Sequence, residues 1–285
     1  MTQRVVGIVY HSDRNAIEHI STGLLEALTA RNIRAIEVDE AIVPGSELSQ
    51  AELIVVLGGD GTMLKAVEYS FEIDIPILGV NLGRVGFLAE AEPSDVDTVV
   101  DFIDRKSWST EERICVVGDV VRNNKSVFKS FALNEVSIEK TQRDLMTELR
   151  IAVDSSPLMA WAGDGIVIST PTGSTAYAFS AGGPVIWPTA NVLLAVPISA
   201  HALFARPIVV SPDSSISAEV LSASATATFD GRRYFDLLEG DHVVVTKAAH
   251  TVRFARVHDT SFTQRLVAKF RLPTVGWREQ RADID

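Results

Sequence analysis

Apolar and polar residues follow two different periods along the first third of the chain. Short apolar runs predict four β-strands, at residues 5–10, 33–38, 53–57 and 75–80. Between them, residues 16–30 carry aliphatic side chains at helical spacing, and a second helix is expected to start at Thr62. The run at 53–57 is wholly aliphatic, which is typical of a strand buried on both faces. This pattern predicts a parallel sheet with helices on both of its faces.

The pattern changes after Cys115, where the apolar runs become shorter and turn residues separate several of them. The runs lie at residues 128–138, 145–153, 165–169, 216–221, 225–229, 242–246 and 252–257. Many short strands with turn signals between them predict an all-β domain of two packed sheets. We expect this domain to span residues 116–258 and to follow an α/β domain of residues 1–115.

The last part of the chain has helical spacing again, at residues 262–270. Phe262 and Phe270 fall on one face of this predicted helix, and Arg265 and Lys269 fall on the opposite face. The helix can bury its apolar face by packing on the first domain. We therefore expect residues 259–285 to complete the α/β domain.

Composition restricts the classes of partner. The net charge is −11 over 285 residues, which argues against general binding to nucleic acid or to a membrane surface. No apolar run approaches the roughly 18 residues of a membrane span, and the first residues lack the pattern of a signal peptide. Cys115 is the only cysteine, and no CxxC or HExxH pattern occurs, so neither an internal disulfide nor a structural zinc site is expected. These features fit a cytoplasmic protein.

A glycine-rich turn follows the third predicted strand, in the sequence VVLGGDGTMLKAV. A strand, a glycine turn and a helix together offer backbone N–H groups to a phosphate. The candidate phosphate-binding loop consists of Gly58, Gly59, Gly61 and Thr62. It lacks the Gly-Lys-Ser/Thr of a Walker A loop and the third glycine of a dinucleotide fingerprint. Asp60 in its centre either caps the helix or accepts the proton of a hydroxyl group that is being phosphorylated.

A second segment, GDGIVISTPTGSTAYAFSAGGP at residues 163–184, combines another Gly-Asp-Gly with many hydroxyl groups. Hydroxyl groups and loop amides suit the hydrogen-bonding edges of a nucleotide, and Tyr177 offers a flat face to a base. The alternative is a Ser/Thr-rich turn, which is common in β domains. The segment has no Gly-x-Ser-x-Gly elbow, which argues against a serine hydrolase.

A third segment, LNEVSIEK at residues 133–140, places Asn134 next to Glu135. Consecutive side chains of a strand point to opposite faces, so these two point the same way only where the backbone bends. The alternative is a polar strand edge.

The three segments, in this order and at this spacing, resemble the NAD kinase family. The sequences LGVNLGRVGFLAE at residues 78–90 and RLVAKFRLPTVGW near the C-terminus strengthen the resemblance, which covers nearly the whole chain. It implies a Rossmann-like α/β domain and a C-terminal β-sandwich domain, with the substrate between them and the C-terminal tail returning to the first domain. It also implies a homodimer or homotetramer.

The resemblance implies a reaction as well. NAD kinases transfer a phosphoryl group, here from ATP or polyphosphate, to the 2′-hydroxyl of the adenosine ribose of NAD and make NADP. A divalent cation, expected to be Mg²⁺, would neutralise the phosphoryl donor, because the chain offers few cationic side chains near the glycine loop. The sequence assigns no metal ligand.

Roles for single residues follow from the resemblance. Asp60 becomes the proton acceptor, with Gly61 beside it. Lys65, one turn into the following helix, becomes a candidate phosphate contact. Asn134 and Glu135 correspond to a pair that contacts the nucleoside.

The second half of the chain supplies the other implied contacts. Asp164 corresponds to an aspartate that contacts bound NAD. The segment around adenine and ribose corresponds to Thr172, Thr175, Ala176, Tyr177, Ala178, Phe179 and Ser180. Arg232 lies near a further ligand contact. Many relatives carry a basic residue two positions before the Gly-Asp-Gly aspartate, where this chain has Ala162, and Arg143 is a candidate to replace that charge.

Three alternatives stay open on the sequence alone. Gly-Gly-Asp-Gly-Thr also occurs in diacylglycerol-kinase-like and phosphofructokinase-like enzymes, so a lipid or sugar kinase is the first. The second is a dehydrogenase that uses NAD without modifying it, and the incomplete glycine fingerprint counts against it. The third is a non-catalytic NAD sensor, and the presence of Asp60 counts against that.

Overall fold

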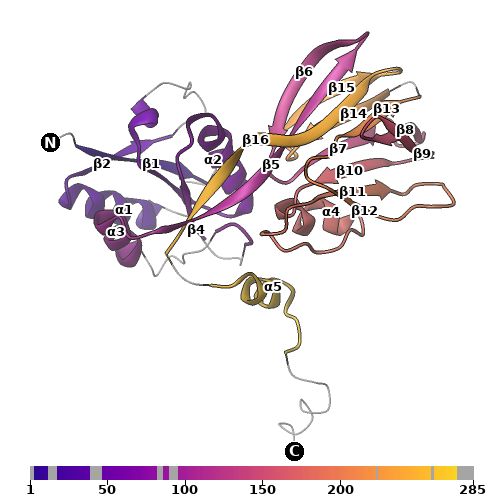
Figure 1. Ribbon diagram of the computed structural model, residues 1–285. Helices are drawn as coiled ribbons and strands as arrows, with labels where there is room; N and C mark the ends of the chain where they lie inside the picture. The colour runs from indigo at the N-terminus through magenta and orange to yellow at the C-terminus, as the bar shows by residue number, and fades with distance from the viewer. Residues whose placement is uncertain are drawn as a thin grey trace, which may run out of the picture. The chain divides into compact units, whose positions relative to one another are not determined.

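The computed structural model describes residues 3–11, 18–38, 47–81, 86–89, 96–222, 224–257 and 260–274. The chain divides into two compact units (Figure 1). The first consists of Met1–Glu112 together with Arg253–Asp285, and the second of Arg113–Val252.

The first unit is built on a parallel sheet, as the apolar pattern predicts. Its strands β1 (Arg4–Tyr10), β2 (Ile33–Glu37), β3 (Leu53–Leu57) and β4 (Ile77–Val80) lie in the order β2-β1-β3-β4, and all neighbours are parallel. The end of β16 (His242–Arg256) continues the sheet beside β4, where Phe254 pairs with Ile77. The connecting helical segments are α1 (Glu18–Ala30), η2 (Glu47–Gln50), α2 (Asp60–Ile73) and α3 (Val96–Arg105).

Helices cover both faces of this sheet, because successive strand residues point to opposite sides. On β4, Leu78 belongs to the apolar cluster that includes Leu24 of α1 and Val99 of α3. Its neighbour Gly79 faces α2, since a Cβ atom there would lie 2.7 Å from the sulfur of Met63. The helices on both faces confirm the predicted architecture.

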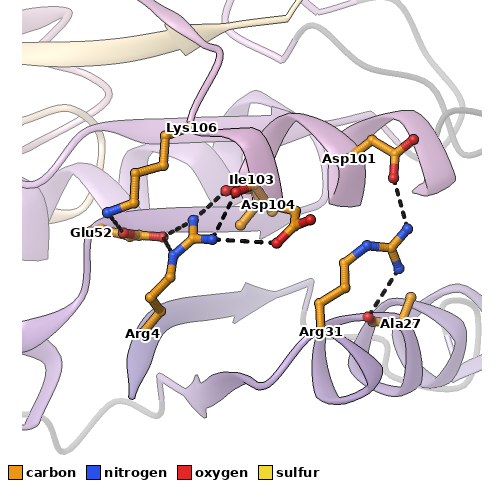
Figure 2. Close-up of polar contacts among 8 residues, drawn as sticks. All are labelled: Arg4, Ala27, Arg31, Glu52, Asp101, Ile103, Asp104 and Lys106. Carbon is orange, nitrogen blue, oxygen red and sulfur yellow. Dashed lines mark hydrogen bonds and ion pairs between the residues drawn. The ribbon is translucent and has the colours of Figure 1, made fainter. Parts of the chain in front are cut away.

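A cluster of charges joins the start of β1 to the end of α3 (Figure 2). The Nε atom of Arg4 donates to Glu52 at 2.9 Å, and its other nitrogens donate to the backbone carbonyls of Ile103 and Asp104. Lys106 adds a second cation, with its Nζ atom 2.6 Å from Glu52. A cation at the last carbonyls of a helix is favoured by the helix dipole, so the cluster fixes α3 against the sheet edge.

The C-terminal helix α5 (Phe262–Phe270) belongs to the first unit, as expected. Ser261 begins it with a capping box, in which the Ser261 hydroxyl accepts from the N–H of Gln264 at 3.2 Å. The rings of Phe262 and Phe270 both pack on the ring of Phe87. The centroid of the Phe87 ring lies 5.8 Å from that of Phe262 and 5.9 Å from that of Phe270. This contact holds the helix to the segment that follows β4.

One expectation about α5 is wrong. Arg265, predicted on the face opposite the phenylalanines, is buried, and its Nη2 atom donates to the carbonyl of Thr260 at 2.8 Å. A long arginine can bury its stem while its polar head satisfies a backbone carbonyl, so apolar spacing alone did not identify it.

The second unit contains two antiparallel sheets. The first sheet has the order β12-β11-β10-β7-β14-β15. In the second, β16, β13, β8 and β9 pair in that order, β5 pairs with β16, and β6 pairs with β5. One apolar cluster takes residues from both sheets, including Val136, Ile166, Ile151 and Val243, so the sheets pack as the predicted sandwich. The remaining strands are β5 (Ser109–Arg122), β6 (Lys125–Ala132), β7 (Glu135–Lys140), β8 (Thr147–Val153), β9 (Ser156–Gly163), β10 (Gly165–Ser169), β11 (Leu193–Ile198), β12 (Ile208–Val210), β13 (Ile216–Val220), β14 (Ser224–Phe229) and β15 (Arg233–Leu238).

Two strand limits differ from the sequence pattern. The runs at 242–246 and 252–257 form one strand, β16, in which the polar residues between the runs are exposed or half-buried while Ala248 stays buried. The single run predicted at 128–138 divides into β6 and β7, and Leu133 and Asn134 form a bend between them. Among the described helices, none is long and apolar enough to cross a bilayer.

Candidate functional site

The glycine loop connects β3 to α2 in a tight turn. The N–H of Gly58 donates to the carbonyl of Val80 at 3.1 Å, which ties the turn to the end of β4. A Cβ atom on Gly58 would lie 2.4 Å from the hydroxyl oxygen of Thr62, so only glycine fits there. A Cβ atom on Gly59 or Gly61 would meet nothing within 4 Å, so the space beside these two glycines is open.

Asp60 does not cap α2, so that interpretation of the carboxylate is wrong. The N-cap is Gly59, whose carbonyl accepts from the N–H groups of Thr62 and Met63 at 3.0 Å each. The carboxylate of Asp60 instead accepts two backbone N–H bonds of 3.1 Å, from Phe87 at Oδ2 and from Leu88 at Oδ1. Each oxygen keeps a further lone pair, so the half-buried carboxylate can still accept a proton from a ligand.

Gly86 makes this arrangement possible. A Cβ atom at Gly86 would lie 2.4 Å from the Oδ1 atom of Asp60, which is far inside van der Waals contact. Sequence reasoning did not single out Gly86, although it lies within the 78–90 block that carries the resemblance. Lys65 is half-buried on the same helix as Asp60, and its role as a phosphate contact stays a prediction.

In the second unit, the fold brings the 133–140 and 163–184 segments together. The hydroxyl of Thr170 donates to the carbonyl of Leu133 at 2.6 Å, and its N–H donates to the carbonyl of Asn134 at 2.9 Å. A Cβ atom on Gly173 would lie 2.1 Å from that Asn134 oxygen, so a glycine is required where the two segments meet. Two segments recognised separately in the sequence thus form one surface.

Glu135 is a buried carboxyl group in this surface. Burial, and then the charge of Asp230, raise the pKa of Glu135 to about 8, while the N–H of Tyr177 lowers it. Glu135 therefore carries a proton at neutral pH and can donate a hydrogen bond to a ligand oxygen. Tyr177 also donates its hydroxyl to the Oε2 atom of Glu139 at 2.8 Å, which fixes the direction of its ring.

This raised pKa predicts that stability falls as pH rises. Between pH 4.5 and about 8, the folded protein keeps a proton on Glu135 that the unfolded chain has released. The stabilisation from this proton is therefore complete below pH 4.5, and it is lost progressively as the pH rises to about 8. The slope reaches about 1.4 kcal/mol per pH unit. Glu135→Gln keeps the shape but does not titrate. Its melting temperature should therefore rise relative to wild type across this interval, and a constant difference would show that Glu135 is ionised throughout.

Asp164 lies between β9 and β10, where its carboxylate is 2.6 Å from the Nζ atom of Lys140. The Lys140 ammonium, followed by a hydrogen bond from Ser199, holds the pKa of Asp164 below its usual value. Lys140 thus supplies a cation beside Asp164, and the role of Arg143 in place of the basic residue missing at Ala162 stays a prediction. The next residue, Gly165, has a φ of +152°, and a Cβ atom there would lie 2.1 Å from the carbonyl of Ile138.

The segment expected around adenine and ribose forms two short helical turns, η4 (Thr172–Thr175) and α4 (Tyr177–Ser180). Thr172 and Ala178 are buried, so they pack beneath this surface and are not open to a ligand. Phe179 and Ser180 are exposed, and Thr175, Ala176 and Tyr177 are half-exposed, so these five are open to a ligand.

Asp230 is a residue of this surface that the sequence suggested only as part of a turn. Its carboxylate accepts from the N–H of Leu133 at 2.8 Å and of Asn134 at 2.7 Å. Arg233 pairs with it at 3.3 Å, while the predicted contact Arg232 is exposed. A backbone contact from Asp230 to residues almost a hundred positions earlier leaves no signal in the sequence pattern.

No group of three or more His, Cys, Asp or Glu side chains that could hold a metal ion occurs in the part of the chain that the structure describes.

Comparison with known proteins agrees with the motifs. Family models of the ATP-NAD kinase N-terminal and C-terminal domains match residues 43–105 and 133–257. NAD kinase 2 of Streptomyces coelicolor is 46% identical over 297 residues, which cover 98% of this chain and 99% of the relative. The NAD kinase of Mycobacterium tuberculosis is 43% identical over 265 residues, which cover 92% and 86%.

Solved structures give the same fold. Yeast NADH kinase, in a complex with NADH, has a TM-score of 0.86 at 20% identity and covers 96% of this chain and 89% of its own. An NAD kinase from Archaeoglobus fulgidus, in complex with ATP, has a TM-score of 0.74 at 26% identity and covers 94% and 98%. Since two family models together match most of the chain and relatives match nearly its whole length, the chain belongs to the NAD kinase family.

Proposed function

We propose that this protein transfers a phosphoryl group from ATP to the 2′-hydroxyl of the adenosine ribose of NAD and thereby makes NADP. The observation that carries the proposal is the carboxylate of Asp60, which two backbone N–H groups hold at the start of α2 within a phosphate-type loop. Relatives named NAD kinase and a related structure in complex with ATP support the same reaction.

Asp60 has the chemistry of the general base. The ribose hydroxyl becomes nucleophilic as its proton passes to a carboxylate oxygen of Asp60, and the hydroxyl oxygen then forms a bond to the γ-phosphorus of the donor. The bond from that phosphorus to the leaving oxygen breaks, and ADP leaves. Backbone N–H groups of the glycine loop, with Lys65, are proposed to hold the donor phosphates.

The second unit is proposed to recognise NAD. The neutral carboxyl of Glu135 and the amide of Asn134 can hydrogen-bond a nucleoside from the bend between β6 and β7. The ring of Tyr177, fixed through Glu139, offers a stacking face, and Asp164 and the 175–180 segment complete the proposed contacts. Arg232, which is exposed, is a further proposed contact.

One assay tests the function and the donor together. The purified protein is incubated with NAD and Mg²⁺, with ATP or polyphosphate as donor, and NADP is measured with an NADP-specific dehydrogenase. NADP formation with ATP supports the proposal, and formation with polyphosphate alone would change the donor. Absence of NADP with either donor, together with phosphorylation of a lipid or sugar, would refute it.

Activity should require a divalent cation. The described residues supply no metal cage, and a triphosphate donor needs its charge neutralised, so excess EDTA is expected to abolish NADP formation. Added Mg²⁺ should restore it, while calorimetric binding of NAD alone should be unchanged by EDTA. Full turnover in EDTA would show that side chains alone neutralise the donor.

We also propose that the protein works in the cytoplasm as a homodimer or homotetramer. The single cysteine and the net charge of −11 support the first part, and the NAD kinase family supports the second. Light scattering of the purified protein measures the number of subunits.

A further inference from the structure

The bend between β6 and β7 rests on a single buried carboxylate. The side chain of Asp230 is only 1% exposed. Its Oδ2 atom accepts from the N–H of Leu133 at 2.8 Å, and its Oδ1 atom accepts from those of Asn134 at 2.7 Å and Glu135 at 3.3 Å. Three consecutive backbone N–H groups therefore converge on one side chain.

This convergence is incompatible with an extended strand. In a strand, successive N–H groups point to alternate sides, so three in a row reach one acceptor only where the chain leaves the extended conformation. Because the chain leaves the extended conformation here, the side chains of Asn134 and Glu135 do not have to point to opposite faces of a sheet. A carboxylate that accepts from all three N–H groups thus stabilises the bent backbone conformation, in which Asn134 and Glu135 can contact the same ligand.

Asp230 is itself held in a defined place. It follows β14, whose last residue Phe229 pairs with Val136 of β7, and its N–H donates to the carbonyl of Glu135 at 3.0 Å. Its φ is +53°, a conformation that aspartate and asparagine adopt more readily than most residues. The turn therefore places the carboxylate directly against the bend.

Arg233 balances the buried charge. Its Nη2 atom lies 3.3 Å from the carboxylate, its Nη1 atom donates to the hydroxyl of Ser130 at 3.1 Å, and its guanidinium lies 4.3 Å from the centre of the Phe131 ring. A buried carboxylate with a cation and three N–H donors is satisfied, whereas an amide side chain has one acceptor oxygen and would leave at least one donor without an acceptor.

We propose that Asp230 is a positioning residue for NAD recognition, which sets the bend that presents Asn134 and Glu135 to the ligand. The proposal rests on the proposed function, in that it takes NAD as the ligand of this pair. It adds a role for a residue that does not itself touch the ligand.

Asp230→Asn tests this role, because asparagine tolerates the same φ but offers one acceptor oxygen and turns an NH₂ group toward an N–H donor. Losing a hydrogen bond to a charged group is expected to raise the KM for NAD about tenfold or more, while kcat changes by less than about threefold. Amide hydrogen exchange at residues 133–135 should become faster.

Asp241→Asn is the matched control. Asp241 is likewise 1% exposed, accepts from the N–H of Leu238 at 2.8 Å and pairs with Arg122 at 2.7 Å, but it has no bond to residues 133–135. Its substitution should lower the melting temperature while leaving the KM for NAD and the exchange at 133–135 as in wild type. If Asp230→Asn is not recovered folded, Asp230→Ser retains one acceptor and is measured in the same way.

The outcomes separate the two proposals. An unchanged KM and unchanged exchange at 133–135 in a folded Asp230 variant would overturn the positioning role, even with a lowered melting temperature. An equal rise in KM for Asp241→Asn would overturn it as well, because the effect would then be one of stability. If wild-type protein makes no NADP, the proposed function fails, and the exchange rates alone decide whether Asp230 holds the bend.

Discussion

Replacing Asp60 with asparagine is expected to lower kcat for NAD phosphorylation by about 10²–10⁴-fold, because it removes the proposed general base. The structure adds a second expectation. Asparagine can accept from only one of the N–H groups of Phe87 and Leu88 and directs its NH₂ group at the other. The variant should therefore also lose about 1–3 kcal/mol of stability. NAD binding by calorimetry is expected to change little.

A control separates these two effects. Ile103→Val removes one buried methyl group from α3, in the same unit, and should cost about 0.5–1.5 kcal/mol without touching Asp60 or Phe87. Its turnover measures how much destabilisation of this unit alone lowers kcat. If kcat of Asp60→Asn lies within a few-fold of kcat of that control, Asp60 is not the general base. Its role would then be to hold the 86–89 segment through the N–H groups of Phe87 and Leu88.

Gly86→Ala should lower kcat by about 10²-fold while the carboxylate itself remains. The new Cβ atom would lie 2.4 Å from Oδ1 of Asp60, so the carboxylate must move by about 1 Å, and a displacement of that size at a reacting group costs about 10²-fold. The KM for NAD should stay near the wild-type value, because the change lies in the first unit.

Gly23→Ala supplies the matched comparison. Gly23 is in α1, and a Cβ atom there meets nothing within 4 Å, so alanine should stabilise the helix by up to about 1 kcal/mol and leave kcat unchanged. If kcat of Gly86→Ala equals that of wild type, catalysis does not depend on the position of the Asp60 carboxylate. Asp60 would then not be the proton acceptor.

Local periodicity predicted the elements whose burial is uniform or strictly periodic. The strand Leu53–Leu57 and the helix Phe262–Phe270 have the limits that the pattern gives. The strand β16 was divided in two because residues such as Lys247 and His250 interrupt its apolar run. In a long strand with one solvent-facing side, polar residues mark exposure rather than an end.

The site was predictable where one short segment contains it. The turn around Gly58 and its following helix could be deduced from residue types alone. The contacts that define Asp60, Asn134 and Glu135 join residues 27 to 96 positions apart, so no local pattern reports them. The same holds for Lys140, which reaches Asp164 across neighbouring strands.

The packing of Phe262 and Phe270 on Phe87 has a consequence for synthesis. The N–H group of Phe87 donates to Asp60, and the ring of Phe87 packs on α5. The proposed proton acceptor and the C-terminal helix therefore both contact Phe87. A ribosome synthesises residues 113–252 before it makes α5. A chain broken off before Phe262 would thus carry the proposed NAD-recognition surface without a fixed base. Such a chain is expected to bind the dinucleotide without converting it.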